Sequence, residues 1–158
     1  MLSELIMIYI AVGVKNLSEP LKCEATVIND WKGEIAGEVL KTTKKISFLG
    51  DVDPNTGVIL AKDSDIRGES IKGKILVFPG GRGSTVGAGV LFGLVKNNVA
   101  PLMLITLVPD QVVISGAIFG DLPMVSYLPQ ECFNKIKTGD VLKVRMINEK
   151  RAEIIRQV

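Results

Sequence analysis

The chain has 158 residues, which is enough for one domain with a substantial core and too few for two domains of ordinary size. It contains 19 basic and 17 acidic residues, a formal net charge of +2, and its lysines are scattered, which argues against nucleic acid as a partner. Apolar residues make up 47% of the chain and its mean hydropathy is +0.33, so we expect an extensive core or a face that a partner covers.

Histidine is absent from the sequence, which removes the commonest general base, the commonest metal ligand and the acceptor of a phosphohistidine carrier. Proton transfer would therefore fall to Ser, Lys, Asp, Glu, Tyr or Cys. Cys23 and Cys132 lie far apart and lack a Cys-x-x-Cys spacing, so by themselves they cannot hold a zinc ion or an iron–sulfur cluster. We expect two buried free thiols, which fit a reduced, cytoplasmic compartment.

Residues 1–20 form an apolar segment whose role the sequence leaves open. Residues 5–14 are shorter than the about 20 residues of a membrane-spanning helix, and no basic segment precedes them, so we expect no transmembrane helix and no membrane partner. The alternatives are a signal peptide, a later translation start, an edge strand, or an N-terminal arm packed on the domain, which we favour. Residues 21–158 should form a single domain.

The first part of that domain has the pattern of β-structure without intervening helices. Residues 23–28 largely alternate apolar with polar side chains, a turn follows at residues 31–33, and a second strand runs over residues 34–40. Residues 53–57, Asp-Pro-Asn-Thr-Gly, lie between two short apolar runs. They predict an ordinary turn, because the acidic spacing and final glutamate of a calcium-binding loop are missing.

The centre of the chain has the pattern of a strand, a tight glycine-rich loop and a helix. The apolar run Ile75–Phe78 ends at a Pro-Gly turn, and an apolar helical segment, residues 86–97, begins just after a Ser-Thr pair that could cap it. The start of a helix carries unpaired N–H groups and a positive dipole end, which would favour an anion or a developing alkoxide at Ser84. Arg82 adds a planar charge suited to a carboxylate or phosphate.

The spacing of this loop excludes three known motifs: the Walker phosphate loop, the Gly-x-Gly-x-x-Gly dinucleotide fingerprint and the Gly-x-Ser-x-Gly nucleophile elbow. Glycine-rich strand-to-helix turns also occur for close packing alone, so the argument for a site depends on Arg82, Ser84 and Thr85 within one turn. In the helix that follows, Gly89 and Gly93 lie four apart, and we expect this small-residue face to pack closely against a sheet.

The second half of the chain alternates strands with helices. Residues 102–108 are an almost continuous apolar run, which is typical of a buried, parallel strand. The further elements predicted are a short helix through residues 113–119 that Pro109-Asp110 could cap, a strand at 123–127, a helical turn at 129–137, and closing strands at 141–147 and 152–155. The sequence thus predicts an α/β fold, a swivelling β/β/α domain with a partly parallel, barrel-like sheet and two to three helices.

Four ordered blocks carry a resemblance to a known family: residues 47–57 (SFLGDVDPNTG), residues 68–79 (GESIKGKILVFP), residues 81–85 (GRGST), and Ala100-Pro101. Together they resemble the small, swivelling-domain subunit of the archaeal aconitase X family. The likeness covers about residues 21–125, and the blocks in this order are much more specific than any one of them. The first 20 residues lie outside it.

The resemblance implies that the chain is one half of a two-subunit iron–sulfur hydro-lyase. In that superfamily a large subunit holds a [4Fe-4S] cluster on cysteines, a Lewis-acidic iron assists the departure of hydroxide, and the swivelling domain supplies a serine as catalytic base. We therefore expect a large-subunit partner, a cluster held by that subunit and not by this chain, and a small-molecule hydroxy acid substrate. The substrate implied is (R)-5-phosphomevalonate, dehydrated to trans-anhydromevalonate 5-phosphate in an archaeal mevalonate pathway.

The resemblance also implies roles for single residues. The Gly-Ser-Ser of aconitase matches Gly83-Ser84-Thr85 here, with Ser84 as the proton acceptor, although a valine replaces the arginine that follows the two serines there. We expect Arg82, Gly81, Gly83 and Thr85 to bind substrate, since glycines let a loop backbone approach it closely. No residue of this chain is expected to bind a metal.

Two other functions stay open at this point. The dehydratase could act on another hydroxy acid, such as a hydroxyproline, or the chain could be a swivelling binding module without catalysis. A neighbouring gene for a large subunit with cluster cysteines would favour the dehydratase over the binding module.

Overall fold

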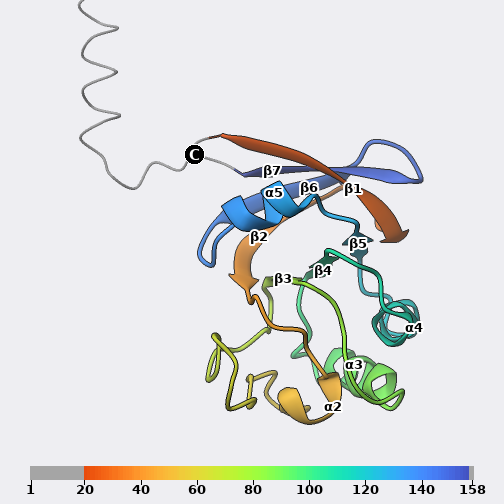
Figure 1. Cartoon of the computed structure of the whole chain (residues 1–158). Helices are drawn as coiled ribbons and strands as arrows, with labels where there is room; N and C mark the ends of the chain where they lie inside the picture. Colours follow the sequence, from red (N-terminus) through yellow and green to blue (C-terminus); the bar gives the residue numbers. More distant parts are fainter. Residues whose placement is uncertain (1–19, 157–158) are drawn as a thin grey trace, which may run out of the picture.

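The structure, a computed structural model, describes residues 20–156, so the predicted N-terminal arm lies outside the described residues apart from Pro20. The described strands close into a barrel in the order β1-β5-β4-β3-β2-β6-β7 (Figure 1). The strands are β1 (Leu21–Asn29), β2 (Glu34–Lys41), β3 (Ile75–Phe78), β4 (Met103–Thr106), β5 (Met124–Ser126), β6 (Val141–Met146) and β7 (Arg151–Arg156).

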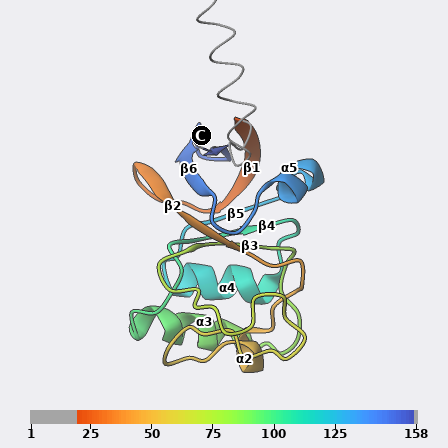
Figure 2. The same ribbon diagram turned by 90° about the vertical axis from the view of Figure 1, so that its left-hand side faces the viewer.

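Helices lie on two sides of this barrel. The helices are α2 (Phe48–Asp51), α3 (Gly87–Lys96), α4 (Gln111–Phe119) and α5 (Gln130–Lys135). Figures 1 and 2 show α3 and α4 side by side below the β3–β4 part of the sheet, while α5 lies against the barrel at its other end. No helix among the described residues has the length and apolar character needed to cross a membrane.

The predicted fold class is confirmed. Strands β2, β3, β4 and β5 form consecutive parallel pairs, whereas β1, β6 and β7 close the barrel through antiparallel pairs. The expected two to three helices correspond to α3, α4 and α5, and α2 adds one short turn of 4 residues. Parallel strands need crossover connections, and α3 and α4 supply two of them.

Strand β3, which precedes the glycine-rich loop, is buried on both of its faces. Successive side chains of a strand point to opposite faces. Ile75 and Val77 therefore belong to the core inside the barrel, whereas Leu76 and Phe78 belong to the core between the sheet and helices α3 and α4. All four side chains are 0% exposed. The loop after Phe78 therefore starts from a rigid support.

The prediction that Gly89 and Gly93 pack against the sheet is wrong. A Cβ added at either position would meet no heavy atom within 4 Å, and the buried side chains of α3 are those of Leu91 and Leu94. The close contact is made by α4 instead: a Cβ on Gly116 would lie 2.7 Å from Leu91 Cδ2. Small-residue spacing alone does not show which face a short apolar helix buries.

The prediction of two free thiols is also wrong. Cys23 in β1 and Cys132 in α5 form a disulfide, with Cα atoms 6.4 Å apart and a sequence separation of 109. The spacing gave no sign of this contact, because closure of the barrel and the packing of α5 bring the two residues together. Free thiols therefore no longer support a reduced compartment.

Candidate active site

The glycine-rich loop between β3 and α3 is anchored at its start by a neighbouring segment. Ile46 N donates to Gly80 O (3.1 Å), and Arg82 N donates to Ile46 O (3.0 Å). Between these bonds, a Cβ added at Gly81 would overlap the Asp110 carboxylate and lie 2.7 Å from Val113 Cγ2. Only glycine fits at position 81 without moving the start of α4.

The second half of the loop turns outward at Gly83. This residue has φ +90°, a left-handed conformation, and a Cβ there would lie 2.6 Å from Ser47 Oγ. The next residues, Ser84 and Thr85, are exposed. Glycine at position 83 thus lets the chain pass close to Ser47 and present the Ser84 side chain to solvent.

The prediction that Ser84 or Thr85 caps the helix is not met. The N-cap of α3 is Val86, and no side chain caps the helix. Gly87 N donates to the backbone oxygen of Ser84 (3.0 Å), while the Ser84 hydroxyl accepts from Val86 N (3.1 Å). A backbone turn thus takes the place of a side-chain cap, and the hydroxyl is bound one residue before the helix begins.

This arrangement favours negative charge on Ser84. Its Oγ accepts an N–H at the positive end of α3, and a hydrogen bond to the charged form lowers the cost of forming an alkoxide. Within the described part of the chain, the backbone N–H groups of Gly83, Ser84 and Thr85 donate to no other protein group. Three consecutive N–H groups remain for an anionic oxygen of a ligand.

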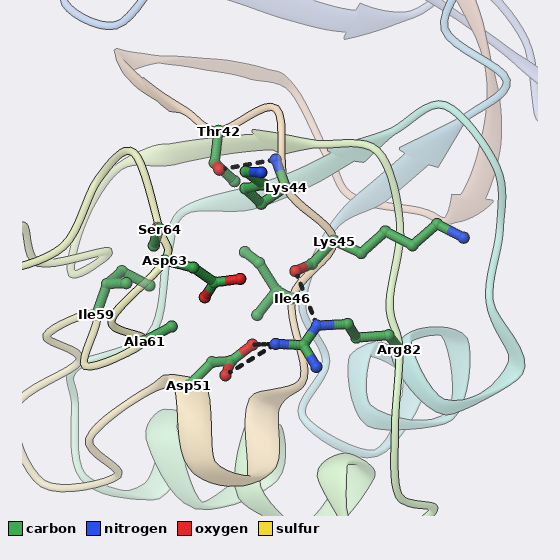
Figure 3. A pocket seen from close by; sticks show the side chains of 10 residues that line it. All are labelled: Thr42, Lys44, Lys45, Ile46, Asp51, Ile59, Ala61, Asp63, Ser64 and Arg82. Carbon is green, nitrogen blue, oxygen red and sulfur yellow. Dashed lines mark hydrogen bonds and ion pairs between the residues drawn. The ribbon is translucent and has the colours of Figure 1, made fainter.

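The Arg82 side chain lines a cavity of about 210 Å³ and points toward Asp51 (Figure 3). Its Nη2 lies 3.1 Å from Asp51 Oδ2, and its Nε donates to Lys45 O over 3.4 Å. The Asp51 side chain is only 15% exposed and also accepts from Ser47 N (2.8 Å), whereas the Arg82 side chain is 50% exposed. Asp51 thus holds a guanidinium group that still has a solvent-facing side.

The remaining wall of the cavity mixes charge with apolar surface. Lys44 and Lys45 add cations, Asp63 adds a carboxylate, and Ile46, Ile59 and Ala61 are apolar.

Beside the cavity, the Asp65 carboxylate accepts hydrogen bonds from the Thr42 hydroxyl and from Thr43. Burial raises the pKa of Asp65, but these hydrogen bonds outweigh it and hold the pKa below its ordinary value, so the carboxylate is charged and fixes this wall.

The sequence placed the five predicted site residues on one loop but missed the partners of Arg82. Gly81, Arg82, Gly83, Ser84 and Thr85 are consecutive, so their grouping carries little information by itself. Asp51 lies 31 positions from Arg82, and no local pattern connects them. The available signal was the block at residues 47–57, which carries the family resemblance and contains Asp51.

The described residues of this chain do not fit a metal or an iron–sulfur cluster. In the described residues no group of three or more His, Cys, Asp or Glu side chains could hold a metal ion. Cys23 and Cys132 use both of their sulfur atoms in the disulfide. No step of the chemistry is therefore assigned to a cofactor held by this chain.

Comparisons with known proteins identify the fold and the family of this chain. A family profile described as the aconitase X swivel domain matches residues 22–154. The chain is 50% identical over 114 residues to the phosphomevalonate dehydratase small subunit of Thermococcus kodakarensis, covering 72% of this chain and 82% of that one. It is 42% identical over 125 residues to the subunit of the same name from Methanosarcina acetivorans, covering 79% and 85%.

A solved structure gives the same result. The crystal structure of Thermococcus kodakaraensis aconitase X, holo-form, aligns with a TM-score of 0.76 and 44% identity, over 85% of this chain and 98% of that chain. At this identity and coverage the alignment supports both the fold and the family.

Proposed function

Because the chain belongs to the aconitase X swivel-domain family, we propose that it is the small subunit of a two-subunit hydro-lyase with Ser84 as its proton acceptor. Its relatives are named phosphomevalonate dehydratase small subunits. The substrate proposed is accordingly (R)-5-phosphomevalonate, and the product is trans-anhydromevalonate 5-phosphate. A hydroxyproline substrate and a non-catalytic binding module are not favoured.

The observation that carries this proposal is the hydrogen bond from Val86 N–H to the exposed Ser84 Oγ. Dehydration of a β-hydroxy acid breaks a C–H bond next to a carboxylate, and the carbon–carbon double bond forms as hydroxide leaves the neighbouring carbon. Ser84 would take the proton as an alkoxide and become a neutral hydroxyl. The hydrogen bond from Val86 N–H and the dipole of α3 would stabilise the alkoxide relative to the neutral hydroxyl.

Substrate binding is proposed for the rest of the loop. The free N–H groups of Gly83 and Thr85 suit an anionic oxygen. Asp110 and Ser47 fill the space that side chains at Gly81 and Gly83 would take, so these two glycines would contact a ligand through their backbone. Arg82 offers the exposed side of its guanidinium to a carboxylate or phosphate, while Asp51 holds the other side.

The cofactor and the compartment belong to the same proposal. We propose that the larger partner subunit holds a [4Fe-4S] cluster, which would assist the departure of hydroxide, because the described residues of this chain do not fit a cluster. We also propose a cytoplasmic location. A disulfide is compatible with that location in hyperthermophilic archaea, whose intracellular proteins are rich in disulfides.

The direct test is reconstitution of the pair. This chain is co-expressed with its candidate large subunit, the cluster is reconstituted anaerobically, and loss of water from (R)-5-phosphomevalonate is measured. We expect turnover by the pair, none by either subunit alone, and no visible absorbance from this chain alone. Turnover of a hydroxyproline in place of the phosphorylated substrate would refute the substrate assignment. A cluster bound to this chain alone would refute the assignment of the cluster to the larger subunit.

A further inference from the structure

Helices α3 and α4 lack the polar outer face of ordinary surface helices. The 9 residues of α4 include no charged side chain, and the 10 residues of α3 include only Lys96, in the last turn. By contrast, α5 has 6 residues and carries both Glu131 and Lys135. A helix that is apolar all round is normally covered on all sides, so the outer faces of α3 and α4 are candidates for a contact surface.

Large apolar side chains and a hollow mark this outer face. Phe119 is 73% exposed and Phe92 is 39% exposed. Together with Ala88 and Gly89 they line an apolar groove of about 300 Å³. A Cβ on Gly89 would meet nothing within 4 Å, so the glycine leaves the hollow open and is not required by contacts within the domain.

An exposed apolar side chain lies between the groove and the proposed catalytic loop. Val86, 58% exposed, directly follows Ser84-Thr85 and precedes α3. Because residues three positions apart share one helix face, Val86, Gly89 and Phe92 form a single stripe along α3. At the C-terminal end of α3 the Lys96 ammonium lies 5.7 Å from the centre of the Phe92 ring, so the apolar stripe ends at a positive charge. We call this surface, made of Val86, Ala88, Gly89, Phe92 and Phe119, the α3–α4 groove.

We propose that the α3–α4 groove docks onto the larger subunit of the hydro-lyase and receives an apolar side chain from it. This inference rests on the proposed function, since a subunit that presents a substrate carbon to Ser84 has to lie over the loop that Val86 shares with the groove. The relatives are themselves named small subunits, which implies a larger partner. An apolar pocket beside a reacting group is also a favourable anchor, because interfaces gain most from buried aromatic and aliphatic contacts near their centre.

The test measures subunit association by sedimentation velocity, without substrate. Phe119→Glu and Phe92→Glu place a charge in the groove, and we expect each to weaken association at least about 10-fold, the loss typical of an interface hot spot. Gly89→Leu fills the hollow with an apolar side chain. It should raise the melting temperature of the isolated chain, because leucine has the higher helix propensity, yet still weaken association. That combination separates blocked docking from damaged folding.

Ile147→Glu is the matched control. Ile147 is 47% exposed, similar to Phe92, and lies in the turn between β6 and β7. The same charge at this position should change association by less than about 3-fold, within the scatter of surface substitutions. Normal association of all three groove variants, or an equal loss in the control, would overturn the assignment of this surface.

The outcomes distinguish this inference from the proposed function. If the wild-type pair associates and the groove variants associate equally well, only the docking surface is wrong. If the wild-type chain binds no larger subunit, the two-subunit function itself fails. A third result, in which Phe119→Glu abolishes self-association of this chain but not binding of the larger subunit, would assign the groove to a second copy of the chain and refute our proposal.

Discussion

Two loops leave adjacent parallel strands of the same sheet and enter neighbouring helices, yet they start those helices in different ways. The loop from β4 ends at Asp110, whose carboxylate accepts from Val112 N (3.1 Å) and caps α4. The loop from β3 ends at Val86, and no side chain caps α3. Instead, the Ser84 hydroxyl binds the N–H just before the helix and stays exposed.

Under the proposed function, this difference separates a structural loop from a reactive one. At α4 the positive end of the helix is already neutralised by the carboxylate of Asp110, which lies between the two loops beside Gly81. At α3 the same field acts on a neutral hydroxyl and on backbone N–H groups that no described group uses. The proposed function therefore places the chemistry at the loop before the uncapped helix α3.

The largest expected effect is a loss of turnover when Ser84, in the loop before α3, is replaced. Ser84→Ala should lower kcat of the reconstituted pair at least ~10²-fold, because a positioned general base supplies this factor. Subunit association and the melting temperature should hardly change, since the hydroxyl is exposed. Thr85→Val is the control next to it and should lower kcat far less. Steady-state kinetics of both variants measure this, and near-normal turnover by Ser84→Ala would make the loop structural.

The next effect concerns the shape of the loop. Gly83→Ala should destabilise the fold by about 1–3 kcal/mol, because alanine is strained at positive φ and its Cβ would crowd Ser47. Gly139→Ala is the matched control, since Gly139 has φ +94° with nothing within 4 Å of an added Cβ. Urea unfolding should show the smaller loss for Gly139→Ala, and only Gly83→Ala should also lower turnover. Equal losses would mean that contact with Ser47 is unimportant.

A smaller effect is expected at the capped loop. Asp110→Ala should lower the free energy of unfolding by about 0.5–2 kcal/mol through loss of the α4 cap, with kcat changed by only a few fold. Asp110→Asn keeps a side-chain oxygen at the cap and should restore most of the stability. A fall in kcat as large as that of Ser84→Ala would break the distinction between a structural and a reactive loop.

The smallest expected effect concerns the pH dependence of stability at Glu153 in β7, away from both loops. Hydrogen bonds from Arg145 and Lys22 hold the pKa of Glu153 below its ordinary value, although burial opposes them. A lowered pKa contributes stability above the unfolded pKa, about 4.3, and that contribution is lost as pH falls through the folded pKa. Melting temperatures between pH 7 and pH 3 should therefore fall less steeply for Glu153→Gln than for the wild type. An unchanged slope would contradict the linkage.

The sequence predicted the parts of the fold that depend on local pattern. The strands β3 and β4 were visible as uninterrupted apolar runs because both of their faces are buried. The Asp110 cap was visible because Pro-Asp before an apolar run is a local signal. Contacts between distant segments were not visible. The Cys23–Cys132 disulfide and the Arg82–Asp51 pair exist only because the closed barrel and its long β2–β3 connection bring them together.

The candidate site was partly predictable for the same reason. The sequence indicated Ser84 and suggested that the Ser84-Thr85 pair could cap the helix. In the structure a backbone turn precedes α3 and no side chain caps it. The prediction for Gly89 was wrong because the spacing of small residues does not show whether that face of the helix points to the sheet or to solvent. Which face of α3 is buried depends on Leu91 meeting Gly116 of the next helix, a contact that only the tertiary structure sets.

The closed ring of strands has a consequence for how this domain behaves outside an assembly. Since β1 pairs along Leu21–Thr26 with β7 and also with β5, the described barrel leaves no open strand edge for another chain to extend. Truncation of the chain before Arg151 would remove β7 and expose the facing edges of β1 and β6. We expect such a truncated chain to aggregate on expression, while the full chain stays dispersed even though its helical side is apolar.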